Sequence, residues 1–280
     1  MKTAILADST CDLSAEQRER LGISIVPLTV SFDDRAFLDN IDLTHTEFFR
    51  LLRKCDQLPS TSQPSPAQFE AVYREALERC DQVVMLSLSS GVSSTYSVAS
   101  TTAAAIAPER IHVVDTLTGS YGAALHLMEA VRLRDAGASA AEIAEVCRDL
   151  AARSHLYVKL DTLRYLKKGG RLSGAAAILG GVMGVKPILQ TVDGRIEAHS
   201  KTRGEEAGKQ ALLQILQEGN VDPRYGVALA HADAPDRLEE YRAFFAPYLE
   251  GMEVYTGSIG CVIGTHSGPG AVGLAFVSRA

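Results

Sequence analysis

The sequence predicts an α/β fold in two domains. We expect an N-terminal three-layer α/β domain with a mainly parallel sheet at residues 1–152, and a smaller C-terminal α/β (α+β) domain at residues 153–280. Three observations predict this. The first half alternates short apolar runs with amphipathic stretches, the second half contains a hairpin signal, and 280 residues of ordinary globular composition suffice for two modest cores. The boundary rests on the change of pattern near Arg153, since no flexible linker separates the halves.

Three apolar runs predict the strands of the N-terminal sheet, at residues 3–7, 82–88 and 111–114. Continuous apolar runs are typical of parallel strands, which are buried on both faces. Helix starts between the strands are predicted by capping boxes, namely Ser14 with Gln17, Thr44 with Glu47, Ser65 with Gln68 and Ser139 with Glu142. From Phe69 to Leu77 the apolar residues recur at helical spacing, which predicts a core-facing helix.

The second half has a different pattern, with a hairpin among its strands. The runs at residues 185–190 and 196–199 flank Asp193-Gly194, a typical hairpin turn. Thr202 and Glu205 form a further capping box and predict a helix start. The remaining expectations are strands at residues 156–160, 225–230, 260–264 and 273–277 and a helix at residues 236–249. A hairpin combined with crossovers predicts a mixed sheet.

Charge and cysteine content exclude several classes of protein. Twenty-eight basic and thirty-four acidic residues give a net charge of −6, whereas duplex nucleic-acid binders normally carry a basic patch. Five scattered cysteines without a C-x-x-C pair suit neither a disulfide framework nor a zinc site. We therefore expect no metal, no cofactor and no nucleic acid.

The apolar runs are too short or too interrupted to span a membrane, which takes about 20 residues. The stretch after Met1 also lacks the features of a secretory signal. We expect a cytoplasmic protein with no transmembrane segment, and transient contact with a membrane surface stays open.

Familiar catalytic motifs are incomplete. Residues 268–273 match G-x-G-x-x-G, but the seven residues that follow cannot supply the helix and acidic residue of a dinucleotide site. No P-loop is present, so the sequence offers no recognisable ATP site of its own. Gly91-Val92-Ser93-Ser94-Thr95 narrowly misses the serine-hydrolase elbow. A Ser93/His266 nucleophile–base pair keeps an acyl hydrolase as the alternative function.

Five polar or glycine-rich segments lie next to predicted strands. They are Asp8-Ser9-Thr10-Cys11-Asp12, Thr61-Ser62-Gln63-Pro64-Ser65, and residues 87–96, 166–173 and 259–266. Hydroxyls and backbone N–H groups at a helix start can hold an anion, although they can also serve only as caps. The cationic segment around Arg171 borders an apolar stretch at residues 175–185. A cation beside an apolar wall suits an amphiphilic anion, and a solvated basic turn is the alternative.

Four motifs, taken in order, resemble the DegV family of bacterial fatty-acid-binding proteins. They are Asp8-Ser9-Thr10-x-Asp12, Thr61-Ser62-Gln63-Pro64-Ser65, Leu166-Lys167-Lys168-Gly169-Gly170-Arg171-Leu172-Ser173 and Ile263-Gly264-Thr265-His266-x-Gly268-Pro269-Gly270. They extend over essentially the whole chain. Ser94 stands where the family usually has glycine, and the sequence does not predict the effect of this change.

The resemblance implies a long-chain fatty acid, about C14–C18, between the two domains, where each buried methylene contributes about 0.8 kcal/mol. By position, Thr61 and Ser93 resemble the hydroxyls that hold the carboxylate, with Arg171 and His266 as neighbouring polar groups. Supporting residues in these motifs are Ser62, Thr95 and Thr265. Acyl chain length, saturation and oligomeric state are not given by the sequence.

The resemblance also implies a partner. Some family members are the lipid-presenting subunit of fatty acid kinase, in which a separate ATP-binding protein phosphorylates the bound acid. Arg171 and, by a looser match, Arg203 resemble residues near the partner surface, and His266 is the one candidate for a catalytic contribution. A carrier of sugars or dihydroxyacetone-type ligands is a third possibility for a similar scaffold.

Overall fold

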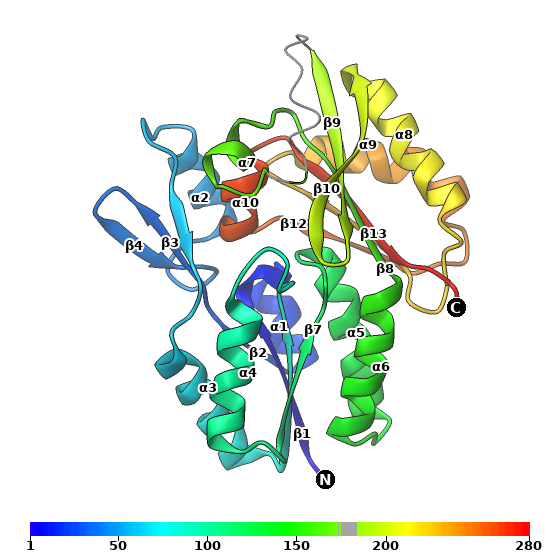
Figure 1. Ribbon diagram of the computed structural model, residues 1–280. Helices are drawn as coiled ribbons and strands as arrows, with labels where there is room; N and C mark the ends of the chain where they lie inside the picture. Colours follow the sequence, from blue (N-terminus) through cyan, green and yellow to red (C-terminus); the bar gives the residue numbers. More distant parts are fainter. Residues whose placement is uncertain (173, 175–183) are drawn as a thin grey trace.

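The two largest sheets come from different halves of the chain, the four-stranded one in the lower half of Figure 1 and the six-stranded one in the upper half. This computed structural model describes residues 1–172, 174 and 184–280. Its N-terminal elements are β1 (Thr3–Asp8), η1 (Ser9–Cys11), α1 (Ala15–Leu21), β2 (Ile23–Val26), β3 (Thr29–Phe32), β4 (Arg35–Leu38), α2 (His45–Leu52), β5 (Ser60–Ser62), α3 (Pro66–Arg79), β6 (Gln82–Ser87), α4 (Thr95–Ile106), β7 (Ile111–Asp115), α5 (Tyr121–Asp135) and α6 (Ala140–Arg153).

The C-terminal elements form the second sheet and its helices. They are β8 (Ser154–Lys159), α7 (Arg164–Lys168), β9 (Val185–Val192), β10 (Arg195–Arg203), α8 (Gly204–Glu218), β11 (Val227–His231), α9 (Pro235–Phe245), η3 (Ala246–Tyr248), β12 (Val254–Ser258), α10 (Cys261–Ser267) and β13 (Val272–Val277). The strand order β10-β9-β8-β13-β11-β12 mixes parallel and antiparallel pairs, as the hairpin predicts.

The N-terminal sheet is parallel throughout and has helices on both faces, which confirms the three-layer prediction. Its order is β2-β1-β6-β7. On one face Leu6 and Met85 pack against Phe69 of α3, and on the other Ile5 packs in a cluster with Leu125 of α5. Alternate residues of β1 thus supply two cores, as expected for a strand buried on both faces.

Four of the predicted capping boxes are present, at Ser14, Thr44, Ser65 and Ser139. The fifth is wrong, because α8 begins at Gly204 after Arg203, without a side-chain cap. The hydroxyl of Thr202 donates to the carbonyl of Lys186 instead. The carboxylate of Glu205 accepts hydrogen bonds from Lys159, 2.5 Å from both oxygens, so it is unavailable for capping.

Residues 261–264 of the predicted strand at residues 260–264 lie in the helix α10 instead. The run Cys261-Val262-Ile263 is apolar and β-branched, which favours a strand locally, but it is the first turn of α10. The amide of Cys261 donates to Asp39 at the start of this helix. Gly264 then packs so closely on Phe48 that a Cβ there would lie 2.9 Å from its ring. Tertiary packing therefore overrides the local preference.

A small antiparallel sheet in the order β4-β3-β5 was not among the predicted elements. Its strands have three or four residues, too few for a clear alternating pattern. This sheet matters because β5 carries Thr61 and Ser62.

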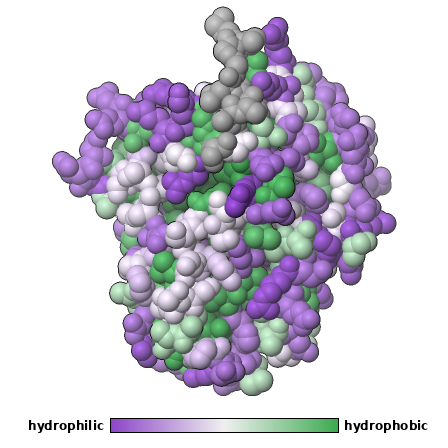
Figure 2. All heavy atoms as spheres, viewed as in Figure 1, coloured by the Kyte–Doolittle hydropathy of each residue, from purple (hydrophilic) through white to green (hydrophobic). Residues whose placement is uncertain are grey.

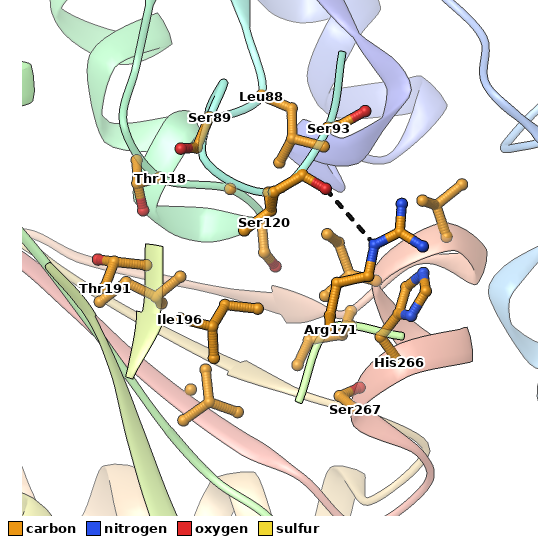
Figure 3. Close-up of a pocket in the computed structure, with 18 of the residues that line it drawn as sticks. Leu88, Ser89, Ser93, Thr118, Ser120, Arg171, Thr191, Ile196, His266 and Ser267 are labelled. Carbon is orange, nitrogen blue, oxygen red and sulfur yellow. Dashed lines mark hydrogen bonds between the residues drawn. The ribbon is translucent and has the colours of Figure 1, made fainter. Parts of the chain in front are cut away.

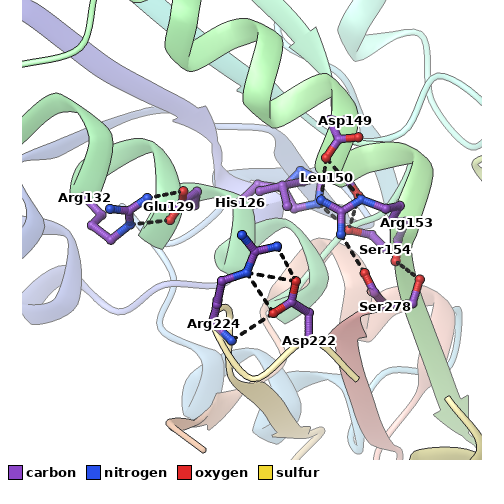
Figure 4. A network of polar contacts seen from close by, with 10 residues as sticks. All are labelled: His126, Glu129, Arg132, Asp149, Leu150, Arg153, Ser154, Asp222, Arg224 and Ser278. Atoms are coloured by element: carbon purple, nitrogen blue, oxygen red, sulfur yellow. Dashed lines mark hydrogen bonds and ion pairs between the residues drawn. The ribbon is translucent and has the colours of Figure 1, made fainter. Parts of the chain in front are cut away.

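The two halves join directly, without a linker. α6 ends at Arg153 and β8 begins at Ser154. Figure 4 shows the polar contacts at this junction. Arg153 pairs with Asp149 and donates to the carbonyl of Ser278, 2.6 Å away, while Ser154 is hydrogen-bonded to His126. One apolar cluster also contains residues of both halves, from Ile5 to Ala275. A division into domains at residue 152 stays a prediction.

Two expectations fall partly outside the described residues. The apolar stretch at residues 175–185 is described only at 184 and 185, and Ser173 is not described. None of the described helices is both long and apolar enough to cross a membrane.

Candidate functional site

A cavity of about 560 Å³ lies between the carboxyl ends of the parallel sheet and one face of the mixed sheet. The volume is within the range of about 300–1,000 Å³ that is usual for small-molecule sites. Its walls are the loops after β6 and β7, part of β5, the strands β8, β9, β11 and β13, and α10. Figure 2 shows hydrophobic residues in the middle of this face of the molecule, surrounded by hydrophilic ones.

The floor of the cavity is made by alternate residues of three neighbouring strands. From β8 come Leu156 and Val158, from β11 Ala228 and Ala230, and from β13 Gly273 and Ala275. Register places Gly273 between Val158 and Ala230, and Ala275 between Leu156 and Ala228. Small side chains on β13 and β11 therefore leave room above the sheet.

The backbone does not explain why residue 273 is a glycine. A Cβ added there would come no closer than 3.9 Å to any protein atom, and its φ is not in the left-handed region. Neither packing nor conformation requires glycine, so the space above it belongs to the cavity.

The cation and the imidazole of the lining lie together at one end of the cavity. Figure 3 shows Ser93, Arg171 and His266 around this end, with Thr118 and Thr191 at the other. Thr61 Oγ1 lies 3.1 Å from Nε2 of His266, within hydrogen-bonding distance. The Arg171 guanidinium donates to the carbonyl of Gly169 over 2.8 Å. A cation, an imidazole and hydroxyls thus border a cavity that is otherwise lined mainly by hydrocarbon.

His266 is neutral at physiological pH. Burial, and in addition the nearby charge of Arg171, lower its pKa from 6.5 to about 4. A neutral ring can accept or donate a hydrogen bond without adding a second positive charge beside Arg171.

The serine loop, residues 88–94, is held from below by a buried carboxyl. Asp8 is 2% exposed and accepts a hydrogen bond of 2.7 Å from the amide of Leu88 and one from Ser87. Burial raises the pKa of this carboxyl above its ordinary value. Asp8 also caps η1 through the amide of Thr10. The first motif therefore shapes the loop, and Asp8 and Asp12 do not line the cavity.

The serine loop also meets the β9–β10 hairpin, which closes one side of the cavity. Ser89 Oγ donates to the carbonyl of Gly194 over 2.6 Å. A Cβ on Gly91 would lie 2.7 Å from the carbonyl carbon of Gly194, so only glycine permits this approach.

The structure brings together Thr61, Ser62, Ser93, Arg171 and His266 in the lining of one cavity. Two predicted supporting residues do not line it. Thr95 is fully buried and bonds to Ser93 Oγ over 2.8 Å, and the hydroxyl of Thr265 donates to the carbonyl of Cys261 within α10.

Arg203 lies outside the cavity lining, exposed at the end of β10. Its role, like the binding roles of the lining residues, stays a prediction.

Sequence patterns did not identify the small floor residues or the loop at Thr118, Gly119 and Ser120, which also lines the cavity. A signal for the floor existed. Large and small residues alternate in Val227-Ala228-Leu229-Ala230 and in Val272-Gly273-Leu274-Ala275, a period of two that places all the small ones on one face.

The geometry does not form the Ser93/His266 pair of a hydrolase. Ser93 Oγ bonds to Thr95, whereas Nε2 of His266 bonds to Thr61. Within the described residues Nδ1 of His266 has no hydrogen-bond partner, so the carboxylate that orients the base in such triads is lacking there. Among the same residues, no group of three or more His, Cys, Asp or Glu is placed to hold a metal ion.

Comparisons with known proteins agree on one family. The sequence model of the DegV family, described as uncharacterised proteins, matches residues 2–279. A DegV domain-containing protein of Caldanaerobacter subterraneus is 33% identical over 279 residues, 99% of each chain. Among solved structures, a fatty-acid-binding DegV family protein from Thermus thermophilus has a TM-score of 0.91 at 33% identity, with full coverage of both chains. DegV from Bacillus subtilis, a fatty acid binding protein, has a TM-score of 0.88 at 29% identity, also with full coverage.

Proposed function

The chain belongs to the DegV family, and on this premise we propose that it binds one long-chain fatty acid in its cavity and presents the carboxylate to a separate ATP-dependent kinase. The observation that carries the first half is the polarity of the cavity. Hydrocarbon lines most of it, while Arg171, its cation, lies at one end with Ser93 and His266, and Thr61 is hydrogen-bonded to His266 there. A fatty acid has the same division between tail and head.

The energetics favour this ligand over a sugar. Each methylene buried against the floor contributes about 0.8 kcal/mol, so a chain of about sixteen carbons supplies on the order of 10 kcal/mol before ordering costs. A carboxylate is ionised at neutral pH, and hydroxyl donors with a nearby cation offset the cost of burying it. A sugar would leave its hydroxyls facing Leu156, Val158 and Leu189 unpaired.

The first test is the lipid content of protein purified without denaturation from a bacterial host. Mass spectrometry of an organic extract should find about one C14–C18 acid per chain. Protein that carries no such acid, and that fails to bind palmitic acid when it is added, would contradict the proposal. A soluble small ligand in its place would favour the sugar-type carrier.

The second half of the proposal, a separate kinase, rests on the groups that phosphoryl transfer requires. Phosphoryl transfer requires groups that hold a triphosphate and Mg²⁺, and the sequence contains no P-loop to supply them. We assign them to a separate ATP-binding subunit in the cytoplasm, with acyl phosphate as the product. The chain alone should make no acyl phosphate from ATP.

The test combines this chain with the ATP-binding subunit of a bacterial fatty acid kinase. Arg203→Glu should lower the apparent affinity for that subunit and leave lipid content intact, because Arg203 is exposed and outside the cavity lining. Arg79→Glu, an equal charge change on α3, is the matched control. His266→Ala should reduce turnover more than lipid binding. Acyl phosphate formed by the chain alone, or normal activity of the Arg203→Glu variant, would contradict these assignments.

An acyl hydrolase remains the alternative, and it predicts a different result. Ser93 should then react with a fluorophosphonate probe, and His266→Ala should abolish the labelling. The bonds of Ser93 to Thr95 and of His266 to Thr61 favour the carrier.

A further inference from the structure

We infer that Gly169 is a positioning residue of the carboxylate site: its backbone fixes the ring of His266 so that the hydroxyl proton of Thr61 points to the ligand. The inference rests on the proposed fatty-acid function and adds to it the residue that sets the hydrogen-bond directions. The three residues come from α10, β5 and the end of α7.

Gly169 lies directly against the imidazole. A Cβ on Gly169 would overlap with Nδ1 of His266 and lie 2.6 Å from Cε1 and 3.3 Å from Cγ. The ring therefore rests on the Cα of Gly169, in a space that any larger residue would fill.

Backbone conformation does not explain this glycine. Gly169 has φ −74°, a value that every residue adopts. The next residue, Gly170, is the opposite case, with φ +73° and nothing within 4 Å of its Cβ position. Glycine at 170 serves the turn, whereas glycine at 169 serves the contact with His266.

Gly169 also holds Arg171, the cation of the site. The carbonyl of Gly169 accepts the hydrogen bond from Nη1 of Arg171 over 2.8 Å. A shift of this backbone would therefore move Arg171 and His266 together.

Contact with Gly169 determines which ring nitrogen carries the proton. Nδ1 is buried against a Cα and has no hydrogen-bond partner among the described residues. A buried N–H without an acceptor is rarer in proteins than an under-used acceptor. The proton accordingly belongs on Nε2, which donates it to Thr61 Oγ1, 3.1 Å away.

Because Nε2 of His266 donates to Thr61, the hydroxyl proton of Thr61 is available for another hydrogen bond. Thr61 Oγ1 accepts from His266, and within the described residues its own O–H has no other partner. The O–H can then donate to a carboxylate. If Nδ1 carried the ring proton, Thr61 would have to donate to Nε2, and the ligand would meet a lone pair instead of a donor.

The test is nitrogen NMR of His266 together with palmitic acid binding. Long-range ¹H–¹⁵N spectra distinguish the two tautomers, and the His266→Gln variant assigns the signal among the seven histidines. Wild-type protein stripped of lipid should show Nε2–H. Gly169→Ala should change this signal and weaken palmitic acid binding on the order of tenfold, because a donor to the carboxylate is lost. Gly170→Asn is the matched control, since Asn tolerates a positive φ and open space surrounds this position.

A double-variant comparison separates positioning from general damage. In a Thr61→Val background, Gly169→Ala should change palmitic acid affinity by less than about twofold, because the donor is already gone. If Gly169→Ala alone is too unstable to study, adding His266→Ala should restore folding by removing the ring.

Three results would overturn the inference. They are an Nδ1–H ring in the wild type, a Gly169→Ala variant with the wild-type spectrum and affinity, and a variant with both Gly169→Ala and His266→Ala that stays unfolded. Wild-type protein that binds no fatty acid would count against the proposed function instead. The spectrum of His266 would still decide whether Gly169 sets the tautomer.

Discussion

The two faces of the six-stranded sheet are made by alternate residues of the same strands, yet they are filled in opposite ways. On one face Leu274 and Phe276 of β13 and Leu229 of β11 pack under α8 and α9. On the other, Gly273, Ala275, Ala228 and Ala230 leave the cavity open. Large residues appear where the protein must fill its own core, and small ones where a ligand would complete it.

The polar groups on the two faces differ in the same way. Lys159 on the helix-covered face is fully buried, and Glu205 satisfies its charge within the protein. On the cavity side, Thr61 of β5 and Arg171, which follows α7, lie outside this sheet, and Arg171 keeps guanidinium donors without a partner among the described residues. Substitutions on the two faces should therefore separate stability from binding.

The largest effect is expected from Phe276→Ala on the helix-covered face. Phe276 is 1% exposed, and its ring lies 5.1 Å from that of His155 and 6.2 Å from that of Tyr157. Loss of such a ring costs about 3–5 kcal/mol of unfolding free energy, which urea denaturation of lipid-free protein measures. The protein that remains folded should bind palmitic acid normally. If Phe276→Ala lowered the binding free energy of palmitic acid by more than the unfolding free energy, the two faces would not have the separate roles described above.

Gly273→Val on the cavity face should have the reverse effect. A Cβ at this position would lie 3.9 Å from the nearest protein atom, which is an ordinary van der Waals contact, so stability should change by less than about 1.5 kcal/mol. In the proposed complex the acyl chain lies over β13, where the valine would overlap with it, and overpacking of this kind costs about 1–3 kcal/mol, or about 5- to 150-fold in the Kd for an eighteen-carbon acid.

Leu274→Val, one position along and on the opposite face, is the control for this substitution. It should lower stability by about 1 kcal/mol and leave the Kd unchanged. An unchanged Kd in the Gly273→Val variant would show that the chain does not cross β13 there.

Removing hydroxyls from the polar end should have smaller effects. Thr61→Val and Ser93→Ala should each weaken fatty acid binding by about 1–2 kcal/mol, because a buried carboxylate loses a donor. Thr101→Val is the control, since Thr101 is exposed on α4 and its hydroxyl donates to the carbonyl of Ser97 in the same helix. Fluorescent displacement titration gives the affinities. Equal affinities of all three variants and the wild type would remove these hydroxyls from the carboxylate site.

The last effect is absent at pH 7 and develops in acid. Burial lowers the pKa of His266 from 6.5 to about 4, so between these values the unfolded chain binds a proton that the folded protein does not. Folding stability should therefore fall as pH drops from 6.5 to 4, and His266→Gln should lack this part of the loss. Urea denaturation of both lipid-free proteins across this range measures the difference. Parallel curves would show that the ring is not buried in its neutral form.

How much of this could be predicted depends on the range of the interactions. Capping boxes join residues three apart, so Ser65 and Gln68 predict the start of α3 without knowledge of the fold. The helix α10 depends instead on contacts of Cys261 with Asp39 and of Gly264 with Phe48. Those partners lie far away in the sequence, and local preference gives the wrong answer.

The residues of the site likewise differ in how far the sequence could predict them. Thr61 and His266 are 205 positions apart and meet over 3.1 Å, a pairing that only resemblance to a family could suggest. The alternation of small residues at Ala228, Ala230, Gly273 and Ala275 was in the sequence throughout. Its meaning depends on which face of the sheet a helix covers, and that is decided by the fold.

Contact between Gly91 and Gly194 has a consequence for timing. Backbone lies on backbone here, and Ser89 ties the hairpin to the serine loop. An acyl chain cannot pass this side while the contact holds, so exchange there must wait for the two segments to part. Release of the proposed fatty acid on this side should then follow the rate at which the serine loop and the hairpin separate, rather than the strength of lipid binding. Two acids of very different affinity would then leave on this side at similar rates, because the separation of the serine loop from the hairpin would set the rate for both.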